Sequence, residues 1–260
     1  MDAYQLANGK SIFHLNKYET DFTYKEIFED KIYNKHGLTF HENACIFDVG
    51  ANIGLFSIFI KQEVKNAQVF AFEPAPHCFE ILEKNVADFG DSVKIYHCGL
   101  GAAEGKMEFT YYPNYTIMSG FYNDIDNDSK LLSASISSQL KQSGRPIADE
   151  RFVEYLMRNK LENPTTTECE VRTISAIIKE NSVKTIDLLK VDAEKAELKV
   201  LQGIEESDWS KIQQVVLEAH EESTKEVVTS MLKSFGFHVI IDVEDNFSST
   251  GVANIYARRE

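Results

Sequence analysis

Residues 45–57 read CIFDVGANIGLFS and predict a strand, a tight turn and the start of a helix. Cys45 to Val49 is a short apolar run, and Gly50 allows the chain to turn sharply after it. From Ile53 to Val64 the apolar residues recur at helical spacing. Ligands of open α/β sheets bind at the carboxyl ends of the strands, so this turn is the first place to expect a ligand site.

The rest of the chain continues the alternation of strands and helices. Helices are predicted at 76–89, 174–181, 194–203 and 224–235, and further strands at 67–72, 93–98, 186–191 and 215–219. The last two strands, 238–243 and 252–258, are separated by a polar turn and predict an antiparallel hairpin. The fold class is therefore α/β, with a Rossmann-like, seven-stranded, mostly parallel sheet and helices on both faces.

The expected organisation is one domain with two additions, because 260 residues suffice for one large α/β core. Residues 1–43 predict an N-terminal helical extension, and residues 44–260 form the main domain. Residues 101–121 predict an extended or hairpin segment rich in aromatic residues. Residues from about 123 to 168 are polar and predict a lid or substrate-binding insertion with one helix at 149–160.

Composition and charge exclude several classes of protein. No apolar stretch is long enough to cross a bilayer, and the N-terminus has no basic region followed by an apolar run. We therefore expect a cytoplasmic protein with no membrane partner. The net charge of −14 argues against a nucleic-acid partner, which would require clustered Lys and Arg. The cysteines, widely spaced, are expected to be reduced packing residues: Cys45, Cys78, Cys98 and Cys169.

The turn after the first strand differs from a dinucleotide fingerprint. Such a fingerprint reads G-x-G-x-x-G, whereas this chain has Gly50, Asn52 and Gly54, with Leu55 where the third glycine would fall. Asp48 beside the turn suits the ammonium and sulfonium groups of S-adenosylmethionine (SAM) and would be awkward for a dinucleotide. The turn therefore favours SAM, with its nucleoside lying across the two glycines.

The ends of the second and third strands carry the next candidates for binding the cofactor. Glu73 lies about 20 residues after the turn, where an acidic residue accepts hydrogen bonds from ribose hydroxyls. Pro74 stops the strand and leaves that carboxylate at the edge of the sheet. After the third strand, Gly99 and Leu100 could frame an adenine ring.

Four segments, in this order, resemble the FkbM-type family of SAM-dependent methyltransferases: DVGANIGLFS (48–57), FEP (72–74), IDLLKVDAEKAELKVLQGI (186–204) and VVLEAH (215–220). The resemblance spans Glu19 to Arg258 and implies a class I methyltransferase fold. It suggests that Glu19 and Tyr24 close over the methionine end of the cofactor, or only dock the N-terminal helix. The chain departs from the family at Lys195, where glycine is usual, so a side chain projects where the family keeps space.

Two further segments, YYPNYTIMSGFY (111–122) and GVANIYARR (251–259), resemble FkbM-type domains within or beside polyketide and nonribosomal peptide synthases. This implies an O-methyltransferase acting on a hydroxyl or enol oxygen of a natural-product intermediate, with an acyl or peptidyl carrier protein as partner or a small-molecule acceptor. Either the carrier contact is mostly apolar, or a basic patch in the insertion receives the carrier: Lys141, Arg145, Arg151 and Arg158. The alternatives are an NAD-dependent oxidoreductase and a non-catalytic module that binds a carrier or a nucleoside.

The candidate catalytic residues follow the fourth and fifth strands of the alternation: Lys190, Asp192 and Glu194 after one, Glu218 and His220 after the other. His220 is the proposed general base, because carboxylates flank it at the ligand edge; Glu218 or Glu194 would hold its tautomer. Asp192 is also expected to touch the cofactor ammonium or the acceptor. Lys190 and Glu194 could instead form an ion pair that fixes the turn.

Two other assignments of the chemistry stay open. His97, at the end of the third strand, is an alternative base. Asp192, Glu218 and His220 could also hold a divalent ion such as Mg²⁺, which would bind the acceptor and lower its pKa. This metal-dependent route is not the favoured one.

Overall fold

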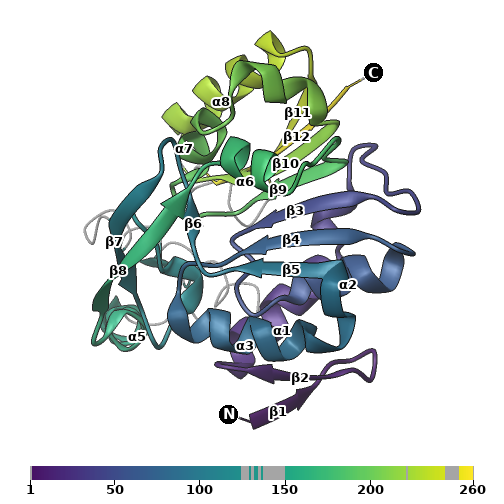
Figure 1. The fold of residues 1–260 in the computed structure, drawn as a ribbon. Coiled ribbons are helices and arrows are strands. Elements are labelled where there is room, and N and C mark those ends of the chain that lie inside the picture. The colour runs from purple at the N-terminus through teal and green to yellow at the C-terminus, as the bar shows by residue number, and fades with distance from the viewer. Residues whose placement is uncertain are drawn as a thin grey trace.

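The computed structural model describes residues 2–123, 129, 132, 133, 136, 150–220, 222–243 and 252–259 of the chain. Its central sheet has seven strands in the order β11-β12-β10-β9-β3-β4-β5 (Figure 1). The strands are β3 (Cys45–Val49), β4 (Gln68–Phe72), β5 (Val93–Tyr96), β9 (Leu188–Val191), β10 (Gln214–Ala219), β11 (His238–Asp242) and β12 (Ala253–Arg258). The antiparallel pairs of this sheet are β10 with β12 and β11 with β12, and the other described pairs are parallel, so the predicted mostly parallel sheet with a C-terminal hairpin is confirmed.

Helices cover both faces of this sheet, as predicted. They are α2 (Leu55–Glu63), α3 (Pro76–Val86), α6 (Ile174–Glu180), α7 (Glu197–Gln202) and α8 (Glu222–Ser234). Side chains alternate along β3, so Ile46 packs with α2 and α3 while Phe47 packs with α6, α7 and α8. Because both faces are covered, the strands read as nearly continuous apolar runs.

Helix α7 is shorter than the predicted 194–203. Glu194 and Lys195 have φ angles of +41° and +71°, which lie in the left-handed region and cannot belong to a right-handed helix. The helix therefore begins at Glu197, and the two residues before it form a left-handed turn.

The N-terminal segment contains a hairpin that the sequence reasoning did not predict. Strands β1 (Asp2–Gln5) and β2 (Ser11–His14) precede α1 (Lys17–Tyr24), a π-helical turn at Lys25–Glu29 and a 3-10 helix, η2, at Ile32–Asn34. Asn8-Gly9 between the strands is a recognised hairpin signal. The Asn16 side chain caps α1 by accepting hydrogen bonds from the backbone of Tyr18 and Glu19. The segment packs on the α2 and α3 side of the sheet.

A second sheet of three strands lies on the side to which β3, β4 and β5 point (Figure 1). Its strands are β6 (Gly99–Leu100), β7 (Gly105–Tyr111) and β8 (Thr165–Arg172), and β7 pairs antiparallel with β8. The expected extended segment at 101–121 thus forms β7 and a short 3-10 helix, η4 (Thr116–Met118). Its partner β8 begins within the stretch assigned to the insertion, which also contains α5 (Glu150–Leu161). Most of residues 124–149 lie outside the described residues.

No helix among the described residues is long and apolar enough to cross a membrane. The four cysteines carry no disulfide; Cys78, Cys98 and Cys169 are buried, and Cys45 is partly buried in β3. They pack in the core, as expected from their spacing.

Candidate functional site

A cavity opens at the carboxyl ends of β3, β4 and β9, where the strand order reverses. It encloses about 1110 Å³ of empty space, part of it open to solvent. Its wall combines the turn after β3, the ends of β4 and β9, the residues before and within β6, helix α1, and the segment from Thr116 to Phe121. Two predicted binding residues at its wall come from distant parts of the chain, Glu19 and Glu73.

The turn after β3 is held against the turn after β9. Gly50 has a φ of +75°, and a Cβ there would lie 1.7 Å from the carbonyl oxygen of Asp192. Protein backbone, and not only a ligand, therefore requires glycine at this position. Gly54 lies outside the cavity: a Cβ there would lie 2.8 Å from Leu82 Cδ1, so this glycine lets α2 pack against α3.

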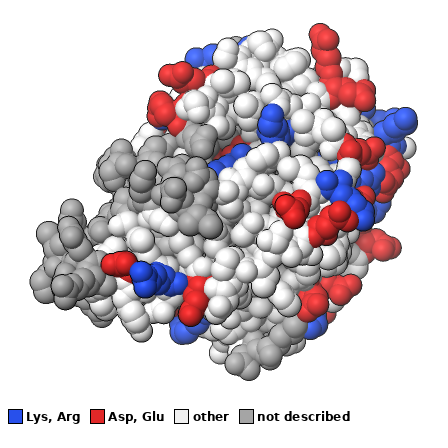
Figure 2. Space-filling view, turned by 90° about the vertical axis from the view of Figure 1, so that its left-hand side faces the viewer, with Lys and Arg blue, Asp and Glu red and all other residues white. Residues whose placement is uncertain are grey.

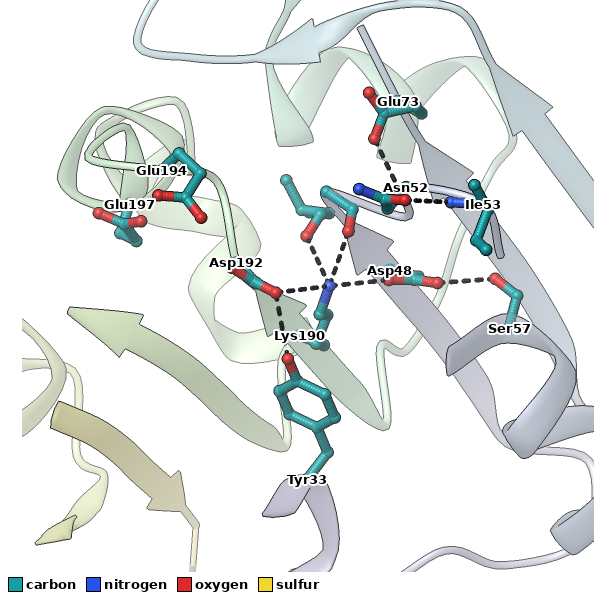
Figure 3. A network of polar contacts seen from close by, with 12 residues as sticks. Tyr33, Asp48, Asn52, Ile53, Ser57, Glu73, Lys190, Asp192, Glu194 and Glu197 are labelled. Carbon is teal, nitrogen blue, oxygen red and sulfur yellow. Dashed lines mark hydrogen bonds and ion pairs between the residues drawn. The ribbon is translucent and has the colours of Figure 1, made fainter. Parts of the chain in front are cut away.

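Lys190 links these two turns from a buried position, with 3% of its side chain exposed. Its Nζ lies 3.3 Å from Asp48 Oδ1 and 3.5 Å from Asp192 Oδ2, and it donates to the carbonyl of Gly50 at 2.8 Å (Figure 3). Burial opposes the charged form, but the two carboxylates hold the pKa of Lys190 above its ordinary value. The expected ion pair of Lys190 is thus made with Asp48 and Asp192, not with Glu194.

Asp48 does not reach the cavity, so the structure corrects its expected contact with the cofactor ammonium. The side chain is fully buried, and it accepts a hydrogen bond from Ser57 Oγ at 2.7 Å besides facing Lys190. Asp192, by contrast, lines the cavity and is 27% exposed. Two carboxylates around one ammonium leave a net negative charge at this edge, which suits a cationic ligand group.

Tyr33 completes the group at Asp192, and the sequence reasoning missed it. Its hydroxyl donates to Asp192 Oδ2 at 3.1 Å, and its ring lies beneath the Lys190 ammonium. Burial, and next the negative charge of Asp192, raise the pKa of the Tyr33 hydroxyl. No motif surrounds Tyr33; only the folding of η2 onto the sheet brings it to the cavity.

Glu73 lies where the ribose of a nucleoside would be expected. Its Oε2 accepts from the backbone N–H of Asn52 and its Oε1 from that of Ala75, both at 2.8 Å. The carboxyl is 5% exposed, and burial raises its pKa to about 7. Both oxygens retain further acceptor capacity, and the residue lines the cavity. Asn52 lines it as well, with its side chain 3.4 Å from the hydroxyl of Thr116.

Glu19 reaches the cavity from α1 and is held by η4. Its carboxylate accepts hydrogen bonds from the backbone N–H and, at 2.7 Å, the hydroxyl of Thr116. Burial raises the pKa of Glu19, and these bonds oppose the rise. Tyr24 faces away: its ring stacks on Phe28 at 4.6 Å, and it does not line the cavity. Helix α1 thus presents Glu19, with Thr20 and Thr23, to the cavity.

Gly99 and Leu100 line the opposite wall, where an adenine ring was expected. A Cβ on Gly99 would lie 2.4 Å from the ring of Phe121, so the absence of a side chain lets that ring close over the backbone. Phe121 lines the cavity, whereas the neighbouring tyrosines of the aromatic stretch do not. Most of that stretch serves packing.

His220 is enclosed by carboxylates and does not line the cavity. Its Nδ1 lies 3.0 Å from Glu197 Oε1 and its Nε2 lies 3.2 Å from Glu194 Oε2. Burial opposes its charged form, but these carboxylates raise the pKa of His220 well above its ordinary value. Neither ring nitrogen therefore has a lone pair available to take a proton from the hydroxyl of a methyl acceptor. This is contrary to the role of general base that was expected for His220. Glu218 also lies outside the cavity wall, whereas Glu194 is part of it.

The geometry supports neither His97 as the base nor a metal site. His97 is exposed and stacks on Phe79 at 4.5 Å, away from the cavity. In the part of the chain that the structure describes, no group of three or more His, Cys, Asp or Glu side chains is arranged to hold a metal ion. Asp192, Glu218 and His220 do not form the metal site considered above, because both nitrogens of the histidine already face carboxylates.

Lys195 does not line the cavity, so it does not fill the space expected from the family pattern. Its φ of +71° gives another reason for a glycine in relatives, because glycine adopts the left-handed region without steric cost. Of the expected basic patch, Lys141, Arg145 and the Arg151 side chain lie outside the described residues, and Arg158 pairs with Glu154 at 3.2 Å.

A family profile described as "Methyltransferase FkbM domain" matches residues 48–239. The 31-O-demethyl-FK506 methyltransferase FkbM of Streptomyces tacrolimicus is 34% identical over 100% of this chain and 97% of its own length. The AMB antimetabolite synthetase AmbE of Pseudomonas aeruginosa is 32% identical over 98% of this chain, which corresponds to 12% of AmbE. A crystal structure of a SAM-dependent O-methyltransferase from Thermotoga maritima has a TM-score of 0.48 and 12% identity, covering 99% of this chain and 77% of that chain.

Proposed function

The chain belongs to the FkbM family of methyltransferases, and on that premise we propose that it methylates a hydroxyl or enol oxygen of a natural-product intermediate. The methyl donor of such an enzyme is SAM. The observation that carries the proposal is the buried Glu73 carboxylate at the end of β4, which lines the cavity across the sheet edge from Asp192.

The residues present fit a SAM molecule. The Glu73 carboxylate would accept both ribose hydroxyls, and Gly99, Leu100 and Phe121 would enclose the adenine. The negative edge at Asp192 would receive the ammonium group, with Glu19 on the α1 side of the same cavity. When bound, SAM supplies a methyl group already activated by the sulfonium charge.

The chain itself must then place the acceptor oxygen in line with that methyl group and receive its proton. Holding two reactants in the correct geometry supplies much of the rate acceleration in such displacements. A carboxylate at the cavity wall can receive that proton.

A carrier-bound acceptor is the second part of the proposal. In support, the chain corresponds to 12% of AmbE, which is named a synthetase, so a region of this kind also occurs within a much larger protein. Figure 2 shows the face onto which β3, β4 and β5 point; on its described part, uncharged surface lies between scattered charged side chains (Figure 2). A carrier could dock there through uncharged surface despite the net charge of −14.

The test combines binding and turnover. Calorimetry should detect binding of SAM and none of NAD; binding of NAD alone would revive the oxidoreductase alternative. Mass spectrometry should then find the added methyl group on 3-hydroxyacyl or 3-ketoacyl groups attached to a carrier protein, and to a lesser extent on the same acyl groups as N-acetylcysteamine thioesters.

Three results would count against parts of this proposal. SAM binding with no methyl transfer to any of these acceptors would favour the non-catalytic module. Equal rates on carrier-bound and small thioesters would refute the carrier as partner. Loss of turnover in the presence of a strong chelator, restored by Mg²⁺, would refute a metal-independent reaction.

A further inference from the structure

We propose that Glu194 is the residue that faces the acceptor hydroxyl and takes its proton, and that His220 and Glu197 are positioning residues behind it. This inference rests on the function proposed above. It reverses the roles expected from the sequence, where His220 was the base and Glu218 or Glu194 held its tautomer.

The order of the contacts points to this assignment. Glu194 lines the cavity, whereas His220 and Glu197 do not. His220 bridges the two carboxylates, with Nε2 3.2 Å from Glu194 Oε2 and Nδ1 3.0 Å from Glu197 Oε1. Glu197 is fully buried and also accepts the backbone N–H of Lys195. Glu197, His220 and Glu194 therefore form a row, in that order, that runs from the interior to the cavity. The row ends in the Glu194 carboxylate.

The backbone fixes the Glu194 end of this row. Glu194 and Lys195 both have left-handed φ angles, and such conformations persist where the surrounding structure enforces them. Gly120 lies against the same turn: a Cβ there would lie 3.1 Å from the carbonyl oxygen and 3.3 Å from the Cβ of Glu194. The segment after η4 thus packs directly on the residue, and both line the cavity.

The other carboxylate at this edge, Asp192, has a different role in the function proposed above, where it receives the ammonium group of SAM. Asp192 faces the Lys190 ammonium and accepts the hydroxyl of Tyr33. Burial is the main effect that raises the pKa of Glu194 well above its ordinary value; Asp192, Glu218 and Glu197 add to the rise, and His220 opposes it. A histidine with two carboxylate partners can hold Glu194 in one orientation, because each ring nitrogen is engaged.

The methyl transfer to the acceptor oxygen requires no reactant besides the acceptor, SAM and water. The acceptor oxygen forms a bond to the methyl carbon while the bond from that carbon to sulfur breaks, with its electron pair going to sulfur. The hydroxyl proton passes to the Glu194 carboxylate and then to water at the open part of the cavity. The positive charge lost at sulfur reappears as that proton.

A binding experiment tests the assignment without knowledge of the acceptor. S-adenosylhomocysteine lacks the methyl group, whereas sinefungin carries a charged amine in its place. In the wild-type protein sinefungin should bind more tightly than S-adenosylhomocysteine, because its amine would meet the Glu194 carboxylate. Glu194→Gln should reduce that preference by about tenfold or more and leave S-adenosylhomocysteine affinity within about twofold, because a charge-assisted hydrogen bond is lost. Glu226→Gln, at an exposed position of α8, should change neither affinity.

The positioning role of His220 has its own readout. His220→Phe should lower the sinefungin preference, and His220→Gln, whose amide can still donate to Glu194, should recover part of it. Equal losses in both variants would assign His220 a purely structural role.

The outcomes separate the two proposals. An unchanged preference in Glu194→Gln, or an equal loss of both ligands, would overturn the assignment of Glu194. Failure of the wild-type protein to bind S-adenosylhomocysteine at all would instead overturn the proposed function. Retained S-adenosylhomocysteine binding shows that each variant is folded.

Discussion

At the scale of single residues, Lys190 is a buried cation on which two turns depend. Its ammonium faces Asp48, which is fully buried, and donates to the backbone of the β3 turn. A buried charge left without its partner is strongly destabilising. The ion pair therefore has a structural role even though it lies at the ligand edge.

We predict that Lys190→Met lowers the free energy of unfolding by about 3–5 kcal/mol, because Asp48 would be left buried and uncompensated. Urea denaturation followed by circular dichroism measures this. Lys199→Met, at an exposed position of α7, is the matched control and should have little effect. The double variant Asp48→Asn with Lys190→Met should recover part of the loss; a double variant as unstable as the single one would contradict the explanation.

Glu73 makes ligand binding depend on pH. Its pKa of about 7 reflects burial, which disfavours the ionised form. Ribose hydroxyls donate to the ionised carboxylate, so a bound nucleoside lowers this pKa and binding releases a proton. Affinity should therefore rise with pH until the free protein has lost that proton.

We predict that the Kd of S-adenosylhomocysteine falls as the pH rises from about 6 to about 8, by at most about tenfold per pH unit. Calorimetry at several pH values measures the slope. Glu73→Gln should bind more weakly at high pH and show little slope. The same slope in that variant would mean that another group titrates.

At the scale of elements, the site depends on two turns that follow neighbouring parallel strands. Gly50 after β3 has no room for a Cβ because of the carbonyl of Asp192 after β9. Residues 194 and 195 after the same strand are left-handed and delay the start of α7. The packing of these two turns against each other therefore sets where Asp192 and Glu194 lie at the cavity wall.

We predict that Gly50→Ala weakens S-adenosylhomocysteine binding by more than tenfold and lowers the melting temperature. Gly9→Ala is the matched control, because Gly9 also has a positive φ but nothing within 4 Å of an added Cβ. The control should lose only the roughly 1–2 kcal/mol of a left-handed alanine. Equal losses at the two positions would mean that backbone strain, and not the contact with Asp192, decides the effect.

At the scale of the whole molecule, the N-terminal segment is part of the site. Leu15, Asn16, Glu19, Thr20, Thr23, Ile27 and Tyr33 all line the cavity. The hydroxyl of Tyr256 in β12 donates to the carbonyl of Ile32 at 2.7 Å, which fastens the segment to the sheet. The family profile begins only at residue 48, so the cavity wall formed by the N-terminal segment lies outside the matched residues.

We predict that a chain lacking residues 1–43 does not bind S-adenosylhomocysteine in calorimetry, because one wall of the cavity is removed. The double variant Glu19→Gln with Tyr33→Phe keeps the segment but removes two of its polar groups at the cavity. It should fold, as judged by circular dichroism, and bind S-adenosylhomocysteine several-fold more weakly. Full affinity in the truncated chain would show that the segment only packs against the domain.

The sequence by itself determined the sheet and the position of its ligand edge. Apolar runs separated by amphipathic helices specify strands buried on both faces, and this pattern is local, so it can be read without coordinates. Gly50, Glu73 and Asp192 were placed at the cavity for the same reason, because each directly follows a strand.

Only the tertiary structure decided which polar groups face the ligand. Tyr33 and Asp192 are 159 residues apart in sequence, and no local pattern predicts their hydrogen bond. Asp48 lies one residue before the end of β3 and His220 directly follows β10, yet both are enclosed by other side chains. Residues at strand ends can point inward or into the cavity, and the choice depends on the burial and charge of partners from distant segments. That choice moved the expected chemistry from His220 to Glu194.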